Sequence, residues 1–151
     1  MQLACPLCHR TSTTIDPALL FTTDSWRVID AQDPDFPGFT RVIWHDHVKE
    51  MTDLTTTEQQ QLMSVVLTVE AVMRQTLSPD KINLASLGNQ VPHLHWHVIP
   101  RWQDDTSFPH SVWTLPSQTA NENAASLARQ NLIKSRLTEY HRALINRLAS
   151  L

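Results

Sequence analysis

The sequence predicts an α+β fold that combines one sheet with two helices. Short segments rich in β-branched and aromatic residues, typical of strands, occur in two pairs along the chain. Each pair is followed by a stretch in which apolar residues recur every three or four positions. That spacing is typical of an amphipathic helix. The order of strands, helix, strands and helix therefore favours an α+β domain.

The first pair of strands is expected at 25–29 (Ser-Trp-Arg-Val-Ile) and 39–44 (Phe-Thr-Arg-Val-Ile-Trp). The intervening segment 33–38 contains two prolines and a glycine, which predicts a turn. The second pair is expected at 81–87 and 92–99, joined by a turn around Gly88-Asn89. From Pro100 to about Pro116 the sequence predicts irregular structure.

The first helix is expected to begin at a capping box, because Thr55 can cap the helix while Glu58 reaches back to it. Its apolar stripe consists of Leu62, Val65, Val69 and Val72. Ser78-Pro79 should end this helix, because proline cannot continue it and disfavours helix in the residue before it.

The second helix is long and is expected to begin at Asn121 or Asn123 and to run to about residue 150. Its stripe is Ile133, Leu137, Tyr140, Leu144 and Leu148, which we assign to core or subunit packing. No repeat or linker interrupts the sequence, so residues 1–151 are expected to form a single domain.

Composition narrows the class of function. The chain has a mass of 17.2 kDa, a net charge of −3 and no run of basic residues, which gives no basis for a nucleic-acid or membrane partner. No apolar stretch approaches the roughly 18–20 residues of a membrane span. The N-terminal residues lack the pattern of a signal peptide. We therefore expect a cytoplasmic protein with reduced cysteines.

The segment His93-Leu94-His95-Trp96-His97-Val98-Ile99 is the most informative in the chain. Its alternation is typical of a half-buried strand, and it should place His93, His95 and His97 on one face. With eight histidines in 151 residues, such a triple is improbable by chance. We expect an active-site strand.

Neutral imidazoles serve as nucleophiles, general acids or bases, and metal ligands. A histidine that attacks phosphorus needs a group that holds its other ring nitrogen, and donors that stabilise the phosphoryl oxygens. Asn83, Gly88, Asn89 and Gln90, in or beside the preceding turn, are candidates. Gly88 can let a backbone N–H approach an anion closely. Asn89 and Gln90 are equally well explained as turn residues.

Residues 93–99 resemble the signature of the histidine-triad (HIT) family of nucleotide hydrolases and transferases. The resemblance extends to Asn83, to the turn at 88–91 and to Pro37-Gly38, and covers about residues 5–101. It implies a HIT-like fold: a mostly antiparallel sheet of about five strands with one central helix. The helix at about 121–150 would be a C-terminal extension.

The resemblance also implies roles for individual residues. His95 would attack the α-phosphate of a nucleotide and form a covalent nucleotidyl intermediate that water resolves. His97 would contact the phosphate and the leaving-group oxygen. Asn83 and Gln90 match positions that contact the phosphates or the scissile bond, although many relatives have Ser or Thr in place of Gln90. Asp30, or else Asp33, falls where relatives contact the ribose hydroxyls.

Two further departures from the family pattern concern the substrate. Phe39 follows Pro37-Gly38, where many members have histidine, and the stretch from Asn83 to Gly88 is one residue shorter than usual. The expected substrate is a dinucleoside polyphosphate, as in diadenosine tetraphosphate hydrolases, a nucleoside phosphoramidate or an adenylylated compound. No organic cofactor is expected.

Cys5-Pro6-Leu7-Cys8 is a C-x-x-C pair, which in a cytoplasmic protein indicates a metal or redox role rather than a disulfide. Zinc requires four ligands, so histidines would have to complete the site. The resemblance implies structural zinc on Cys5, Cys8, His47 and His93. His45 and His9 are competing ligands. Two thiols without a metal are the plain alternative.

Two other functions remain open from the sequence. One is a metallohydrolase with catalytic zinc on the three histidines, although carboxylate partners are lacking close after His97. The other is a non-catalytic protein that binds nucleotides as a dimer. The family resemblance implies a homodimer, formed through a sheet edge and a helix.

Overall fold

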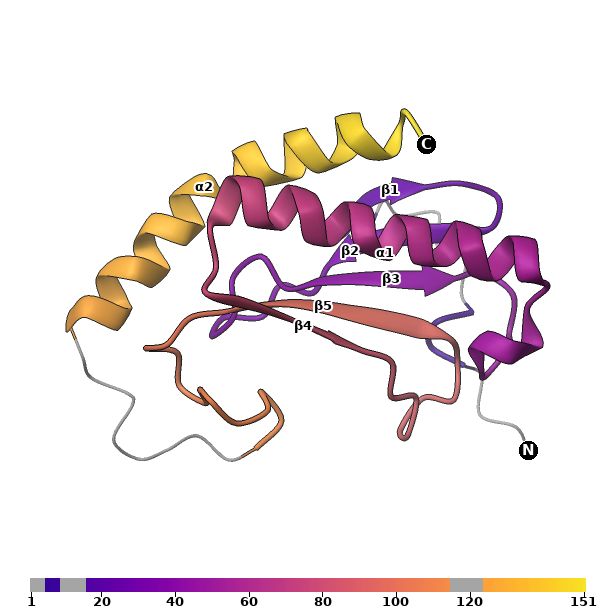
Figure 1. The fold of residues 1–151 in the computed structure, drawn as a ribbon, viewed down its shortest axis with the longest axis horizontal. Helices are drawn as coiled ribbons and strands as arrows, with labels where there is room; N and C mark the ends of the chain where they lie inside the picture. The colour runs from indigo at the N-terminus through magenta and orange to yellow at the C-terminus, as the bar shows by residue number, and fades with distance from the viewer. Residues whose placement is uncertain (1–4, 9–15, 115–123) are drawn as a thin grey trace.

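The computed structural model describes residues 5–8, 16–114 and 124–151, and these form one antiparallel sheet with two long helices on the same side of it (Figure 1). The sheet order is β1-β2-β3-β5-β4. The strands are β1 (Leu19–Thr22), β2 (Trp26–Asp30), β3 (Thr40–Trp44), β4 (Lys81–Ala85) and β5 (His95–Arg101). The helices are α1 (Thr56–Leu77) and α2 (Ala124–Leu148), and a 3-10 turn spans Met51–Asp53. The α+β fold class is thus confirmed.

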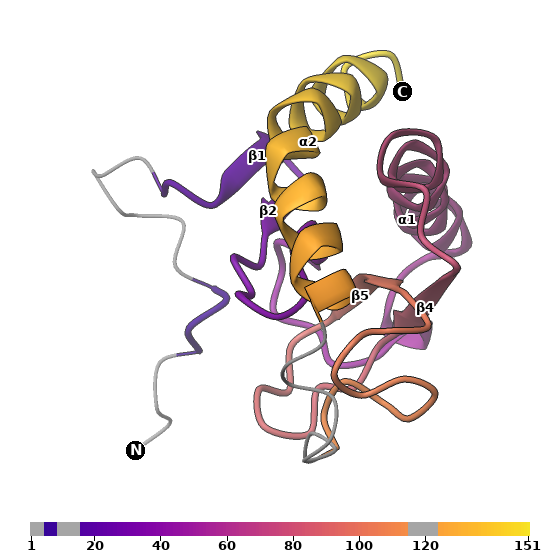
Figure 2. The ribbon, with the colours of Figure 1, turned by 90° about the vertical axis from the view of Figure 1, so that its left-hand side faces the viewer.

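Alternation along the strands separates the two faces of the sheet. Val28 of β2, Val42 of β3 and Val98 of β5 are fully buried beneath the helices. The residues between them point to the opposite face, because successive side chains of a strand alternate. In the part of the chain that the structure describes, no helix covers that opposite face (Figure 2).

Helix α1 begins and ends where its sequence predicts. The Thr55 hydroxyl accepts a hydrogen bond from the backbone N–H of Glu58, and the Glu58 carboxylate accepts one from the backbone N–H of Thr55. At the other end Ser78 adopts the left-handed conformation, with φ 52°, directly before Pro79. The predicted stripe is buried, and α1 uses it to cover the sheet.

Helix α2 packs beside α1 rather than extending away from the domain (Figure 2). Ile133, Tyr140, Leu144 and Leu148 of its predicted stripe are buried, and Leu137 is partly buried. The Tyr140 hydroxyl lies 2.7 Å from the Thr40 hydroxyl, which itself donates to the Gly38 carbonyl. This buried pair attaches α2 to the central strand β3. The proposed helix starts, Asn121 and Asn123, lie outside the described residues.

Three elements differ from the sequence prediction by two residues or more, and one of them is β4, which ends at Ala85 and not at residue 87. Strand β1 was not predicted, because it has only four residues, lies at the sheet edge and shows no alternation of buried and exposed positions. Strand β5 begins at His95 and not at residue 92, so His93 lies before the strand. None of the described helices is long and apolar enough to cross a membrane.

Candidate functional site

The site is built on the face of the sheet that the helices leave open. His95 and His97 alternate with Trp96 and Val98, which pack into the core on the other face. In the register with β3, His95 lies opposite Ile43 and His97 lies opposite Arg41. Both histidines are largely buried, although they are polar.

The tautomer of His95 follows from its surroundings. Its Nδ1 lies 2.6 Å from the backbone carbonyl oxygen of His93. A carbonyl oxygen can only accept, so Nδ1 carries a proton, and in the neutral ring Nε2 has the free electron pair. The ring that lines the cavity therefore has a nucleophilic nitrogen, with its opposite nitrogen held by the main chain.

His97 lies in a different environment. Its ring lies edge-on to that of His95, with centroids 4.7 Å apart, and also contacts the rings of Phe39 and Trp113. Burial, and then electrostatic interaction with His95 and with the charged Arg41, lower the pKa of His97 to about 4. His97 is therefore neutral at pH 7.

A cavity of about 370 Å³ opens in front of the two histidines. Three of the predicted substrate-binding residues, Gly88, Asn89 and Gln90, line it together with His95 and His97. Gly88 has a φ of +66°, a left-handed conformation that a side chain would strain. The loop before the triad thus presents main chain to the cavity that His95 lines.

Asn83 lies on the same face but lines an adjacent cavity of about 520 Å³. Its side-chain oxygen accepts a 2.8 Å hydrogen bond from Nη1 of Arg101, which fixes the orientation of the amide. The buried Arg101 also forms an ion pair with Asp105. Trp113 borders both cavities, so the two spaces share one wall residue.

Asp30 is not brought to the histidines. It shares the helix-covered face with Val28, and its carboxylate lies 3.0 Å from Nε2 of His141 in α2. Asp33, the alternative, accepts hydrogen bonds from the backbone of Asp35 and Phe36 inside its own turn. Both carboxylates have structural partners where the resemblance implies contacts with ribose.

His93 does not point along the row with His95 and His97. Its Nε2 donates to the carbonyl oxygen of Trp44 at 2.7 Å, which leaves Nδ1 with a free electron pair. That Nδ1 lies 3.5 Å from Sγ of Cys5 and 3.4 Å from Sγ of Cys8. His93 thus faces the cysteines, and its backbone carbonyl orients His95.

Cys5, Cys8, His47 and His93 form a cluster whose ligand atoms all lie within 4.8 Å of one another. The close pairs are 3.1–3.5 Å apart. A tetrahedral zinc with bonds of 2.0–2.3 Å needs ligand separations of roughly 3.3–3.8 Å. The four residues therefore could hold a metal ion, and the bond from His93 to Trp44 is the kind that orients a histidine ligand.

Of the competing ligands, His45 does not join this cluster. Nδ1 of His45 lies 3.1 Å from the carbonyl oxygen of Asp24, so the ring is directed there. His9 lies outside the described residues. Among those residues this cluster is the one group of metal ligands that the fold assembles, and neither His95 nor His97 belongs to it.

Sequence reasoning missed two residues of the site, Arg41 and Trp113. Both line the cavity with His95 and His97. Arg41 stands in an ordinary strand pattern, and Trp113 stands in a segment without periodicity. Only the pairing of β3 with β5 and the path of the chain after Arg101 bring them to the histidines.

The chain was compared with known proteins. The HIT domain family model matches residues 12–104. AP-4-A phosphorylase of Mycobacterium tuberculosis is 32% identical over 81 residues, which are 50% of this chain and 42% of that protein. Bis(5'-nucleosyl)-tetraphosphatase [asymmetrical] of Schizosaccharomyces pombe is 34% identical over 79 residues, 49% of this chain and 43% of that protein. The matches thus span less than half the length of these relatives.

Among solved structures, a histidine triad protein from Bradyrhizobium japonicum superposes with a TM-score of 0.63 and 28% identity. The superposition covers 84% of this chain and 89% of that one.

Proposed function

This chain belongs to the HIT domain family, and we propose that it is a nucleotide hydrolase or transferase that acts at the α-phosphate of a nucleotide conjugate. The observation that carries this proposal is the hydrogen bond from Nδ1 of His95 to the His93 carbonyl. In the neutral ring it places the free electron pair on Nε2, and this ring lines a cavity. The named activities of the two curated relatives, a phosphorylase and a tetraphosphatase, support the same reaction class.

The proposed reaction has two displacements. Nε2 of His95 attacks the α-phosphorus, the new P–N bond forms, and the bond to the leaving-group oxygen breaks. The imidazole then carries a positive charge, which the His93 carbonyl stabilises through Nδ1–H. Water next attacks the phosphorus, the P–N bond breaks with its electron pair returning to Nε2, and the proton of the water passes to solvent, which restores His95. His97 would contact the phosphate and the leaving oxygen, and N–H groups around Gly88 and Asn89 would bind the phosphoryl oxygens.

The test is to trap the intermediate. Wild-type protein is mixed with diadenosine tetraphosphate, quenched within milliseconds and digested for mass spectrometry. An adenylyl group on His95 is expected. His95→Ala should lose turnover by several orders of magnitude and retain nucleotide binding. Binding without any adduct or turnover would favour the non-catalytic alternative, and wild-type turnover in His95→Ala would refute the assignment.

We further propose that Cys5, Cys8, His47 and His93 bind zinc. The spacing of their ligand atoms and their mixed sulfur and nitrogen donors suit that ion. The metal would supply stability by joining the N-terminal segment to the chain just before β5. A catalytic zinc on the three triad histidines is disfavoured, because His93 faces the cysteines and the Nδ1 of His95 is taken by a carbonyl.

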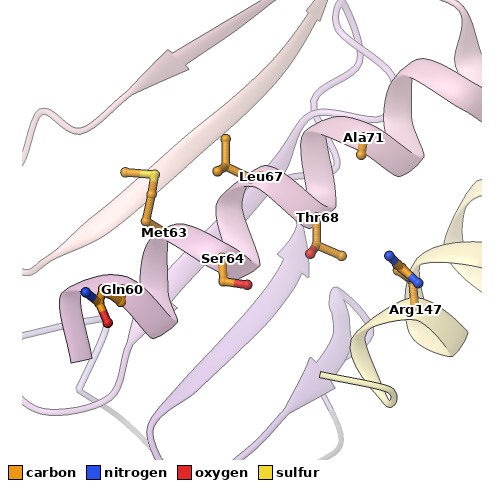
Figure 3. A pocket seen from close by; sticks show the side chains of 7 residues that line it. All are labelled: Gln60, Met63, Ser64, Leu67, Thr68, Ala71 and Arg147. Atoms are coloured by element: carbon orange, nitrogen blue, oxygen red, sulfur yellow. The ribbon is translucent and has the colours of Figure 1, made fainter. Parts of the chain in front are cut away.

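A homodimer is proposed from the exposed surface beside β4. This strand lies at the sheet edge, and Leu84 on it is 37% exposed. On α1, Met63 and Leu67 line a groove of about 490 Å³ that Arg147 of α2 borders (Figure 3). An open edge strand next to apolar side chains is a surface that pairing with a second copy would cover. Light scattering at micromolar concentration should give twice the 17.2 kDa mass of one chain; a mass of one chain would refute it.

A further inference from the structure

Arg41 is the cationic side chain of the histidine cavity. It lies opposite His97 in the register of β3 with β5, and both residues line the cavity with His95. None of the described residues that line this cavity is acidic. The charge of Arg41 is therefore not neutralised by the wall of the site.

The guanidinium of Arg41 is held in place by an aromatic ring, but one of its hydrogen-bond donors has no acceptor. It lies over the ring of Phe39, 5.3 Å from the centroid, and Phe39 is buried against His97. Its Nε is buried and has no hydrogen-bond partner among the described residues. Arg27, on the same face, differs, because its guanidinium donates to the carbonyl of Leu7. A buried donor without a partner is unfavourable, so the Nε–H of Arg41 lacks an acceptor that a bound ligand could supply.

The position of Arg41 determines which part of a bound substrate its side chain would contact. His95 attacks the α-phosphorus in the proposed function, on which this inference rests. Arg41 lies two residues along the sheet and one strand across from His95, roughly 8 Å between backbones. It stands beside His97, the residue proposed to contact the leaving oxygen. Arg41 therefore lies on the leaving-group side of the attacked phosphate, where the next group of the substrate would be.

We propose that Arg41 is a specificity-determining residue that binds a second phosphate, next to the one that His95 attacks. Guanidinium and phosphate form charge-assisted, often bidentate hydrogen bonds, which satisfy the fork of N–H groups. Substrates with a polyphosphate chain gain this contact. Nucleoside phosphoramidates, which have one phosphate, do not. Arg41 thus selects nucleoside polyphosphate conjugates over nucleotides with an uncharged leaving group.

The kinetic test compares two substrates in three proteins. Wild type, Arg41→Met and the control Arg74→Met, an exposed charge on α1, are assayed with diadenosine tetraphosphate and adenosine 5'-phosphoramidate. Arg41→Met should lower kcat/KM for the tetraphosphate about 10- to 100-fold and for the phosphoramidate no more than about threefold. Arg41→Lys should retain part of the selectivity, and Arg74→Met should match wild type. Equal losses on both substrates, or no loss on either, would overturn the inference.

A binding test separates this inference from the proposed function. The affinities of ATP and AMP are measured by calorimetry for wild type, Arg41→Met and Arg41→Lys, with melting temperatures as the check on folding. Wild type should bind ATP more tightly than AMP, and Arg41→Met should lose most of that difference. The same ATP-to-AMP ratio in wild type and both variants would overturn the role of Arg41. If wild type forms no adduct and turns over neither substrate, the proposed function fails, and the binding ratio alone decides the role of Arg41.

Discussion

Asp104 and Asp105 are adjacent in sequence but should differ sharply in their contribution to stability. Asp105 is 5% exposed and forms an ion pair with Arg101, which is 2% exposed. Two bonds of 2.7 and 3.0 Å join the two side chains. The Asp105 carboxylate also accepts from the backbone N–H groups of Trp102, Ser107 and Phe108. It therefore organises the turn that follows β5.

The Asp105→Ala substitution leaves the guanidinium of Arg101 buried without its counter-ion. Removal of one partner from a buried pair costs about 3–5 kcal/mol, because the remaining charge is uncompensated. Asp104 forms an ion pair with Arg129 at 2.6 Å, but the two side chains are 33% and 14% exposed. For Asp104→Ala we therefore expect only about 0–1 kcal/mol. For a chain of this length the first variant should melt about 6–20 °C lower.

Urea denaturation followed by tryptophan fluorescence at pH 7 measures both losses. A loss below about 1 kcal/mol for Asp105→Ala, or equal losses for the two variants, would refute the assignment of the buried pair. Arg101→Met combined with Asp105→Ala should recover part of the stability, because no buried charge is then left alone. Arg101 also holds the amide of Asn83, so the double variant should not recover full activity even where it recovers stability.

Further predictions concern single groups. The pKa of His97 is about 4, against an ordinary value near 6.5, so NMR titration should find this ring neutral at pH 5. Because the unfolded chain binds that proton more readily, His97 should make the free energy of unfolding fall as pH drops from about 6.5 to about 4; a ring that titrates near 6.5 would contradict this. Cys5→Ser with Cys8→Ser should release zinc and lower the melting temperature, with a smaller loss of turnover than His95→Ala; full activity without zinc would contradict a metal site. Tyr140→Phe should cost about 0.5–1.5 kcal/mol in chemical denaturation through its lost bond to Thr40, and no change would show that the bond does not hold α2.

Much of the architecture could be predicted from local patterns. The capping box at Thr55 and the Ser78-Pro79 stop set the bounds of α1, because both act through neighbouring backbone groups. The stripe of α2 identified its buried face for the same reason, since helical periodicity is a local property. Strand β1 escaped prediction because its pairing with β2 stabilises it, and its four residues carry no pattern of their own.

The alternation from His93 to His97 was enough to indicate the active-site strand and the face that His95 and His97 share, because side chains of a strand alternate strictly. It could not separate His93 from the other two. The residue-by-residue register of β5 with β3 ends at His95, and the chain before it turns His93 toward Cys5 and Cys8. In the same way, only the strand register places Arg41 opposite His97. The pairing of Asp30 with His141 likewise depends on how α2 packs on the sheet. Local sequence determines periodicity, whereas contacts between distant segments depend on which strands pair and which face each helix covers.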